Sequence, residues 1–334
     1  ADSGNNRIQK FDGSGNFLAK WGSNGTGDGE VQYPFGITTD QSGNIYVADS
    51  ENNRIQKFNS NGNFLAKWGN SGTGNGQFYS PQGITIDQSG NVYVTDLGNN
   101  RIQKFTSSGT YLAQWGSEGT ENGEFQYPRD IATDQSGNVY VTDIYNHRIQ
   151  KFSATGTYLS QWGSSGTGDG EFQYPGGITI DQSGNVYVVD SGNDRIQKFN
   201  SNGNFLAKWG SSGVGDGQFS EPYGIATDQS GNVYVTDAGN NRVQKFDGNG
   251  AYLAQWGGVG ASHGKFNMPV GITVSADGTI YVSEYMGSRI QAFAYPSDPT
   301  PPTPPTPTPD LPTDINGDGT VDTTQPNVQG LISP

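Results

Sequence analysis

The chain has 334 residues, with 32 acidic and 18 basic side chains and a net charge of −14. It contains no cysteine, so its stability does not rest on disulfides. There is no transmembrane run and no basic stripe, and we therefore expect neither membrane insertion nor nucleic-acid binding by a charged face.

The most regular feature of the sequence is a repeat of 47 residues. A variant of R-[IV]-Q-[KA]-F begins at each of Arg7, Arg54, Arg101, Arg148, Arg195, Arg242 and Arg289. The same step relates six tryptophans from Trp21 to Trp256, and also the phrase P-x-G-I, which reads P-R-D-I at Pro128. A fixed period in this range predicts a stack or ring of identical supersecondary units.

One unit contains four short β-prone runs, each bounded by turn residues. In chain order they are Ile84–Asp87, Val92–Thr95, Arg101–Phe105 and Tyr111–Trp115. They are rich in Ile, Val, Thr and aromatic residues, and Gly-containing turns join the first to the second and the third to the fourth. Four antiparallel strands per unit, repeated radially, predict an all-β chain that forms a β-propeller.

The phrase D-S-x-N-N-R-I-Q-K-F, preceded by G-N-I-Y-V-A, occupies residues 43–58 and resembles the NHL repeat. The resemblance covers about residues 1–293 and implies a six-bladed propeller, which we expect to span residues 1–295. The third strand type occurs seven times and the others six times. We therefore expect Phe17–Trp21 to close the ring beside the strands at 272–293, with Arg7–Phe11 or Arg289–Phe293 displaced or doubled at the seam.

The C-terminal segment differs from the repeats. Residues 296–312 hold nine prolines in seventeen positions and predict an extended Pro/Thr linker of the kind typical of secreted multimodular proteins. Residues 313–334 contain a run that fits the first nine positions of a calcium loop, with candidate ligands Asp314, Asn316, Asp318, Thr320 and Asp322. This run resembles half of a dockerin, which implies calcium as a cofactor and a cohesin-like partner. Position 12 is Gln325, a departure from the family's acid.

Two places in the unit change sharply between repeats. The residue after Pro in P-x-G-I is in turn Phe35, Gln82, Arg129, Gly176, Tyr223 and Val270. The pair after the second strand also varies, and both places lie on connections that emerge at one face of a propeller. A scaffold that varies at one mouth is typical of a binding surface, although drift at exposed loops is the alternative. The predicted ligand-binding face is Phe35, Gln82, Arg129, Asp130, Tyr145, His147, Tyr223, Tyr285 and Met286.

Two recurring acids have structural explanations. Asp49 and its equivalents precede an arginine by five residues in every unit, which predicts a structural ion pair that ties neighbouring strands. The turn acids Asp40, Asp87, Asp134, Asp181 and Asp228 are predicted to be Asx-type hairpin residues.

No catalytic constellation stands out. Some NHL propellers are lyases that hold a metal with several histidines, but this chain has only His147 and His263. Without cysteine these cannot form a three-ligand His/Cys site, and no nucleophile elbow or phosphate-binding loop is present. We therefore expect a non-catalytic, secreted or cell-surface scaffold that binds a protein or glycan. The alternatives are a self-assembling structural protein and a carbohydrate-active or lyase enzyme of a dockerin-bearing complex.

Overall fold

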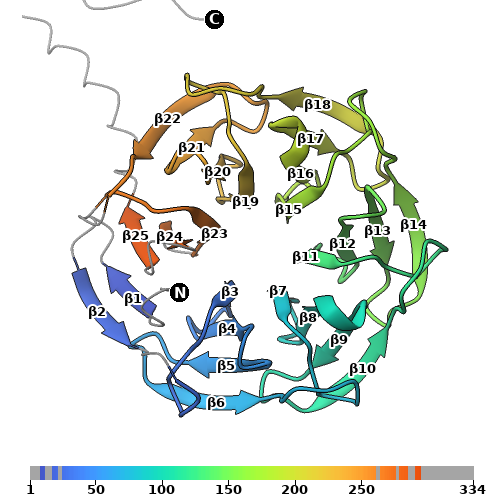
Figure 1. The fold of residues 1–334 in the computed structure, drawn as a ribbon, viewed down its shortest axis with the longest axis vertical. Helices are drawn as coiled ribbons and strands as arrows, with labels where there is room; N and C mark the ends of the chain where they lie inside the picture. The colour runs from blue at the N-terminus through green and yellow to red at the C-terminus, as the bar shows by residue number, and fades with distance from the viewer. Residues whose placement is uncertain are drawn as a thin grey trace, which may run out of the picture. The chain divides into compact units, whose positions relative to one another are not determined.

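The computed structural model describes residues 8–11, 17–21, 25–260, 264–275, 278–284 and 290–294. These residues belong to one compact unit, Ala1–Tyr295, built from β-sheets set around a common centre (Figure 1). Within these ranges, two single 3-10 turns are present, η1 (Leu97–Asn99) and η2 (Ser191–Asn193). Within this described part, no helix has the length and apolar character needed to span a membrane.

Each blade is entered at its innermost strand and left at its outermost strand. The innermost strands are β3 (Pro34–Thr39), β7 (Pro81–Ile86), β11 (Pro128–Thr133), β15 (Pro175–Ile180), β19 (Pro222–Thr227) and β23 (Pro269–Val274). The second strands are β4 (Ile45–Asp49), β8 (Val92–Asp96), β12 (Val139–Asp143), β16 (Val186–Asp190), β20 (Val233–Asp237) and β24 (Thr279–Glu284).

The third and fourth strands complete the blades toward the outside of the ring. The third strands are β5 (Arg54–Phe58), β9 (Arg101–Phe105), β13 (Arg148–Phe152), β17 (Arg195–Phe199), β21 (Arg242–Phe246) and β25 (Ile290–Ala294), together with β1 (Ile8–Phe11). The fourth strands are β6 (Phe64–Trp68), β10 (Tyr111–Trp115), β14 (Tyr158–Trp162), β18 (Phe205–Trp209), β22 (Tyr252–Gly257) and β2 (Phe17–Trp21).

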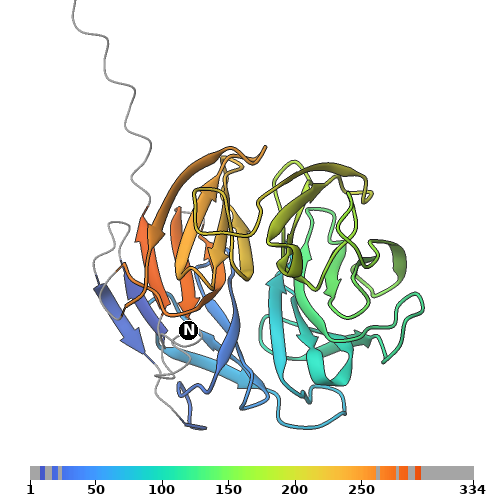
Figure 2. The same ribbon diagram turned by 45° about the horizontal axis from the view of Figure 1, so that its top comes forward.

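The sheets confirm a propeller of four-stranded antiparallel blades. Among the described residues, five sheets have four strands each, and β23, β24 and β25 form a three-stranded sheet at the sixth position. The hairpin β1–β2 lies beside that sheet in both views, with β1 against β25 (Figures 1 and 2). The N-terminal hairpin therefore closes the ring as expected. Both candidate extra copies of the third strand are present at the seam, as β1 and β25.

The first strand of each blade begins three residues earlier than the β-prone run indicated. In the second blade, Pro81 already pairs with Asp96, and the register then shifts before Ile84 pairs with Val94. The shift is a bulge, which accommodates an extra residue and bends the strand. The bulge holds the variable residue after each proline, here Gln82, beside the axis of the ring.

The first hairpin of each of the first five blades is held by its turn acid, as predicted. The Asp87 carboxylate accepts hydrogen bonds from the backbone N–H groups of Ser89 and Asn91, at 2.9 and 2.8 Å. Its other oxygen accepts a bond from the Tyr93 hydroxyl at 2.9 Å. An Asx turn of this kind satisfies the backbone donors that a two-strand turn leaves unpaired.

The core consists of layers between consecutive blades. One such layer combines Tyr93 and Ile102 of the second blade with Phe125, Val139 and Phe152 of the third, all of them buried. Equivalent layers occur around the ring, and one between the first and sixth blades joins Val47 to Tyr281. Since each blade buries both faces against its neighbours, a single blade has no core of its own.

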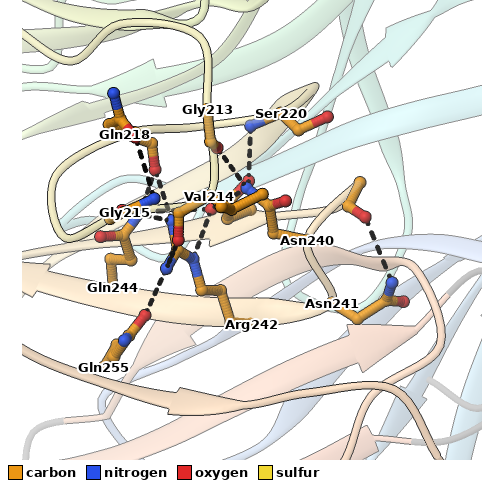
Figure 3. Close-up of polar contacts among 12 residues, drawn as sticks. Gly213, Val214, Gly215, Gln218, Ser220, Asn240, Asn241, Arg242, Gln244 and Gln255 are labelled. Carbon is orange, nitrogen blue, oxygen red and sulfur yellow. Dashed lines mark hydrogen bonds and ion pairs between the residues drawn. The ribbon is translucent and has the colours of Figure 1, made fainter.

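In the first five blades, a buried arginine joins the third strand to the loop that leads into its blade, as Figure 3 shows for Arg242. Arg242 Nε donates to Asp237 Oδ2 at 2.7 Å, and its Nη groups donate to the carbonyls of Val214, Gly215 and Gln218 at 2.7–2.8 Å. The ion pair recurs with Arg54, Arg101, Arg148 and Arg195 at 2.7–2.8 Å. The Asp/Arg spacing thus marks a structural clamp, as predicted.

Candidate functional site

Five of the predicted face residues meet at the axis of the ring. Phe35, Gln82, Arg129, Asp130 and Tyr223 line a narrow cavity of about 60 Å³ between the innermost strands. Arg129 and Asp130 both lie on β11. The other three residues lie on three different innermost strands. Side chains more than a hundred residues apart are brought together because the ring places every P-x-G-I phrase at one level.

A wider hollow of about 700 Å³ shares lining residues with this cavity. The hollow is bounded by Phe35, Gln82 and Tyr223 at the axis and by Glu51, from the loop after the second strand, at its edge. We call the surface formed by the starts of the innermost strands and the loops after the second strands the channel mouth. The two variable places of the repeat therefore do lie on one face, around one opening.

Close approach of the innermost strands explains the glycine of P-x-G-I. A Cβ atom at Gly36 would overlap the carbonyl oxygen of Gln82, and one at Gly224 would overlap that of Val270. Only glycine allows the backbones to come this near. The narrow channel is therefore set by the backbone, and the residue after each proline decides its chemistry.

Asp130 breaks this glycine rule in the third blade. Its two carboxylate oxygens accept hydrogen bonds from the backbone N–H groups of Ile131, at 2.9 Å, and of Ile178 on β15, at 3.0 Å. The side chain thereby bridges two blades. Burial raises the pKa of Asp130 to about 6, partly offset by these two bonds and by the charge of Arg129.

Arg129 crosses the channel and stacks on Tyr223, with its guanidinium carbon 3.5 Å from the ring centroid. The Tyr223 ring in turn contacts Phe35 at a centroid distance of 5.5 Å. The intervening blade has Gly176 at this position, where a Cβ would lie 3.7 Å from Arg129 Nη1. Burial lowers the pKa of Arg129 to about 10, so the side chain remains cationic at neutral pH.

Tyrosines surround the opening. Among the described residues, the exposed aromatic side chains all lie at the channel mouth, and they are 45–59% accessible: Tyr33, Tyr79, Tyr127, Tyr145 and Tyr174. Tyr145 contacts Tyr127 and Tyr174 edge to face, at centroid distances of 5.1 and 6.0 Å. The other large apolar side chains that are exposed in this part of the chain are five leucines, all on outermost strands, and two valines.

Three of these tyrosines, Tyr33, Tyr127 and Tyr174, share an unusual backbone conformation. The residue before each innermost-strand proline is left-handed, with φ of 46° to 61°: Tyr33, Ser80, Tyr127, Tyr174, Glu221 and Met268. Such a conformation is unfavourable for residues other than glycine and persists only where neighbours fix it. Here the backbone N–H of Tyr127 is held by Asn100 Oδ1 at 2.8 Å, and four equivalents are held in the same way.

His147 occupies one of these bracing positions. Its Nδ1 accepts the backbone N–H of Tyr174 at 3.2 Å, where other blades use an asparagine or aspartate oxygen. Its ring also contacts Tyr174 at a centroid distance of 5.0 Å. The histidine singled out in the sequence therefore supports the tyrosine beside it, and that tyrosine faces solvent.

Some predicted residues lie outside the part of the chain that the structure describes. Tyr285 and Met286 are among them, as are the candidate calcium ligands Asp314, Asn316, Asp318, Thr320 and Asp322. The calcium site and the dockerin-like tail stay predictions. Within the described ranges, no group of three or more His, Asp or Glu side chains could hold a metal ion.

Sequence reasoning missed several residues of the mouth. Tyr33, Tyr127, Tyr174 and Met268 border its hollows, and all belong to the position before the proline. That position also varies between repeats, from Tyr to Ser, Glu and Met. The same comparison of repeats that identified Arg129 would therefore have found them.

The ring of antiparallel four-stranded blades makes this protein a β-propeller. The family model of the NHL repeat matches residues 32–58, 78–105, 125–152, 172–199, 219–246 and 266–293, and the chain belongs to this family. This confirms the resemblance drawn from the repeated phrase. A comparison with curated protein sequences found no match.

Several solved structures share the fold. A streptogramin B lyase is 19% identical, with a TM-score of 0.64 and coverage of 86% of both chains. An inactive virginiamycin B lyase from Staphylococcus aureus is 18% identical, with a TM-score of 0.62 and coverage of 86% of this chain and 87% of the other. A gluconolactonase from Xanthomonas campestris is 13% identical, with a TM-score of 0.59 and coverage of 78% and 86%.

The prediction that the chain is not an enzyme is wrong, because these structural neighbours are enzymes. That prediction rested on the small number of histidines and on missing linear motifs. A propeller builds its sites from side chains of several blades, and such sites leave no linear motif. At these identities the likeness shows the fold alone, so it assigns no reaction to this chain.

Proposed function

We propose that the protein binds a protein or glycan ligand at the channel mouth. The observation that carries this proposal is the distribution of exposed aromatic side chains, which gather at this face and not on the outermost strands. Tyrosine offers a large, rigid contact area with a polar end, and it is enriched where binding energy concentrates. The channel mouth thus combines the repeat-to-repeat variation with the side chains best suited to recognition.

The scaffold supports this proposal energetically. Tyr127 and Tyr174 are fixed by backbone braces before any ligand arrives, and Tyr145 is packed between them. A preformed surface loses less conformational entropy on binding than a loop that must become ordered. The variable residues can therefore change ligand without disturbing the clamps that hold the blades.

We further propose a secreted or cell-surface location, in which the Pro/Thr-rich residues 296–312 tether the propeller to a larger assembly. The composition of that segment supports this proposal, since such linkers are typical of secreted multimodular proteins. Calcium binding by residues 314–322 and a cohesin-like partner, or self-association, belong to the same proposal.

Arrays of glycans and of extracellular proteins test the binding proposal. Replacing Tyr145 or Tyr174 with alanine should weaken binding by about 2 kcal/mol, or roughly 30-fold, because each is a central aromatic anchor. Leu159 on β14 gives the matched control, since it is an exposed apolar residue of the third blade, as Tyr145 is, but lies on the outermost strand. L159A should bind as the unaltered protein does.

Two results would count against the proposal. One is equal binding by the tyrosine variants and the unaltered protein. The other is a loss of binding in L159A that the tyrosine variants do not share, which would place the ligand on the outer strands. Thermal unfolding of each variant separates loss of a contact from loss of the fold.

Catalysis at the same mouth is a second candidate, favoured by the chemistry of Asp130. A buried carboxyl with a pKa near 6 beside a cation suits general acid–base chemistry near neutral pH. Turnover of the ligands that bind, followed by chromatography of the products, tests this candidate. Turnover that D130N abolishes supports it, and turnover that D130N leaves unchanged removes Asp130 from that role.

A further inference from the structure

Arg129 differs from the other arginines of the propeller in how its guanidinium is used. The arginines of the third strands donate their N–H groups to an aspartate and to loop carbonyls, as Arg101 does to Asp96 and to the Gly74 carbonyl. Among the residues that the structure describes, the Arg129 guanidinium has no hydrogen-bond or ion-pair partner, and its packing contact is the face of Tyr223. It is also the one charged residue that follows a proline in the P-x-G-I series.

A stacked guanidinium keeps its binding edge free. The contact with Tyr223 uses the flat face of the group, while its N–H donors point outward in the plane. Gly176 leaves open the space beside Nη1 that a larger residue would fill. Arg129 also lines a hollow of about 250 Å³, together with Tyr174, Tyr223 and Met268.

The charges around Arg129 favour an outside partner over an internal one. Asp130 is its nearest acid in the chain, but both carboxylate oxygens already accept backbone N–H groups. Glu221 borders the same hollow and repels a bare anion. A ligand must therefore add apolar contact to its charge, and Tyr174, Tyr223 and Met268 offer that contact. A planar carboxylate is the group that a guanidinium fork binds with two parallel hydrogen bonds.

We propose that Arg129 recognises a carboxylate on the ligand, and that the ligand is an acidic saccharide whose sugar ring packs on Tyr174 and Tyr223. This inference rests on the proposed binding function and names its substrate class. The size of the hollow suits a single sugar residue, since it lies below the range of about 300–1,000 Å³ that holds larger ligands. Longer chains extend from it over the remaining tyrosines of the channel mouth.

Calorimetric titration with two matched probes tests the inference. One probe is a short oligogalacturonate, and the other is the same oligosaccharide with its carboxyl groups methyl-esterified. The unaltered protein should bind the acid at least tenfold more tightly than the ester. R129Q should lose at least tenfold in affinity for the acid and remain unchanged for the ester, while R129K should lie between them because it keeps the charge without the fork.

K208Q provides the control, because Lys208 lies on an outermost strand in an exposed ion pair with Asp169. It removes the same charge and should bind both probes normally. Equal affinity of R129Q and the unaltered protein for the acid would overturn the inference. If Y174A still weakens binding in that case, the proposed binding function stands and only the role of Arg129 is rejected.

Equal binding of acid and ester by the unaltered protein overturns the inference in the same way. Binding of neither probe also overturns it, since no acidic saccharide is then recognised. The proposed function is decided separately in that case, by the protein and glycan arrays. Circular dichroism of R129Q and R129K confirms that the fold is intact before either is titrated.

Discussion

Removal of one clamp arginine should destabilise the propeller strongly. Arg101 Nε donates to Asp96 at 2.7 Å, and its Nη groups donate to the carbonyls of Thr73, Gly74 and Gln77 at 2.6–2.8 Å. The two charged side chains are 7% and 0% exposed. In R101Q the carboxylate stays buried without its cation and the loop carbonyls lose their donors. The expected cost is about 3–5 kcal/mol, the usual result of removing one partner of a buried pair.

The matched control is an exposed ion pair of similar length. Lys208 Nζ lies 2.6 Å from Asp169, with side chains that are 43% and 55% exposed. Solvent already screens this pair, so K208Q should cost less than about 1 kcal/mol. The comparison isolates burial, since both variants replace a base with glutamine.

Urea unfolding followed by tryptophan fluorescence measures the free energy of unfolding of each variant. Because repeat units can open separately, amide hydrogen exchange across residues 69–80 should show whether the loop into the second blade opens first. The double variant D96N/R101Q removes the buried charge as well. It should be about 1–2 kcal/mol more stable than R101Q alone. A cost in R101Q no larger than in K208Q would refute this reasoning.

Three further changes test other parts of the structure. Because folding raises the pKa of Asp130 from 3.8 to about 6, the stability of the unaltered protein should fall relative to D130N by about 2 kcal/mol as pH rises from 4 to 6. The free energy of unfolding of H147N should lie within about 1 kcal/mol of that of the unaltered protein, because asparagine can also accept the Tyr174 N–H. H147A loses this acceptor and should be less stable than H147N. In urea, G109A should cost at least about 1 kcal/mol more than G90A: both glycines have positive φ, but a Cβ at Gly109 would lie 2.6 Å from the Trp68 ring, whereas one at Gly90 would meet nothing within 4 Å.

The repeat made the fold predictable, because every position of the unit could be compared with its equivalents. The strand runs Arg101–Phe105 and Tyr111–Trp115 match β9 and β10. The start of β7 at Pro81 was missed, because a proline and glycine within three residues do not resemble a strand. Its bulge becomes visible only when the partner strand is in place.

The site was predictable in position but not in mechanism. Variation after the proline identified Arg129 and Tyr223 as mouth residues. Their stacking could not be predicted, because it joins side chains from two blades that are 94 residues apart in the sequence. Tyr127 and Tyr174 have a left-handed backbone that propensities do not predict. The sequence places His147 on the predicted ligand-binding face, and the structure gives it a bracing hydrogen bond.

Only part of what the clamp arginines contact could be predicted from the sequence. Its aspartate partner lies five residues away and was recognised from spacing, but its loop acceptors lie 24–28 residues away. Backbone carbonyls carry no sequence signature, so their role appears only once the loop is folded. The clamp is therefore more extensive than the ion pair that the sequence indicated.

Crystallography of the protein soaked with oligogalacturonate tests the central claim most directly. The account predicts density at the channel mouth, with a carboxylate about 2.7–3.2 Å from the Arg129 guanidinium and a sugar ring against Tyr174 and Tyr223. Density confined to the opposite face, at the Asx turns such as Asp87–Asn91, or to the outermost strands would contradict it.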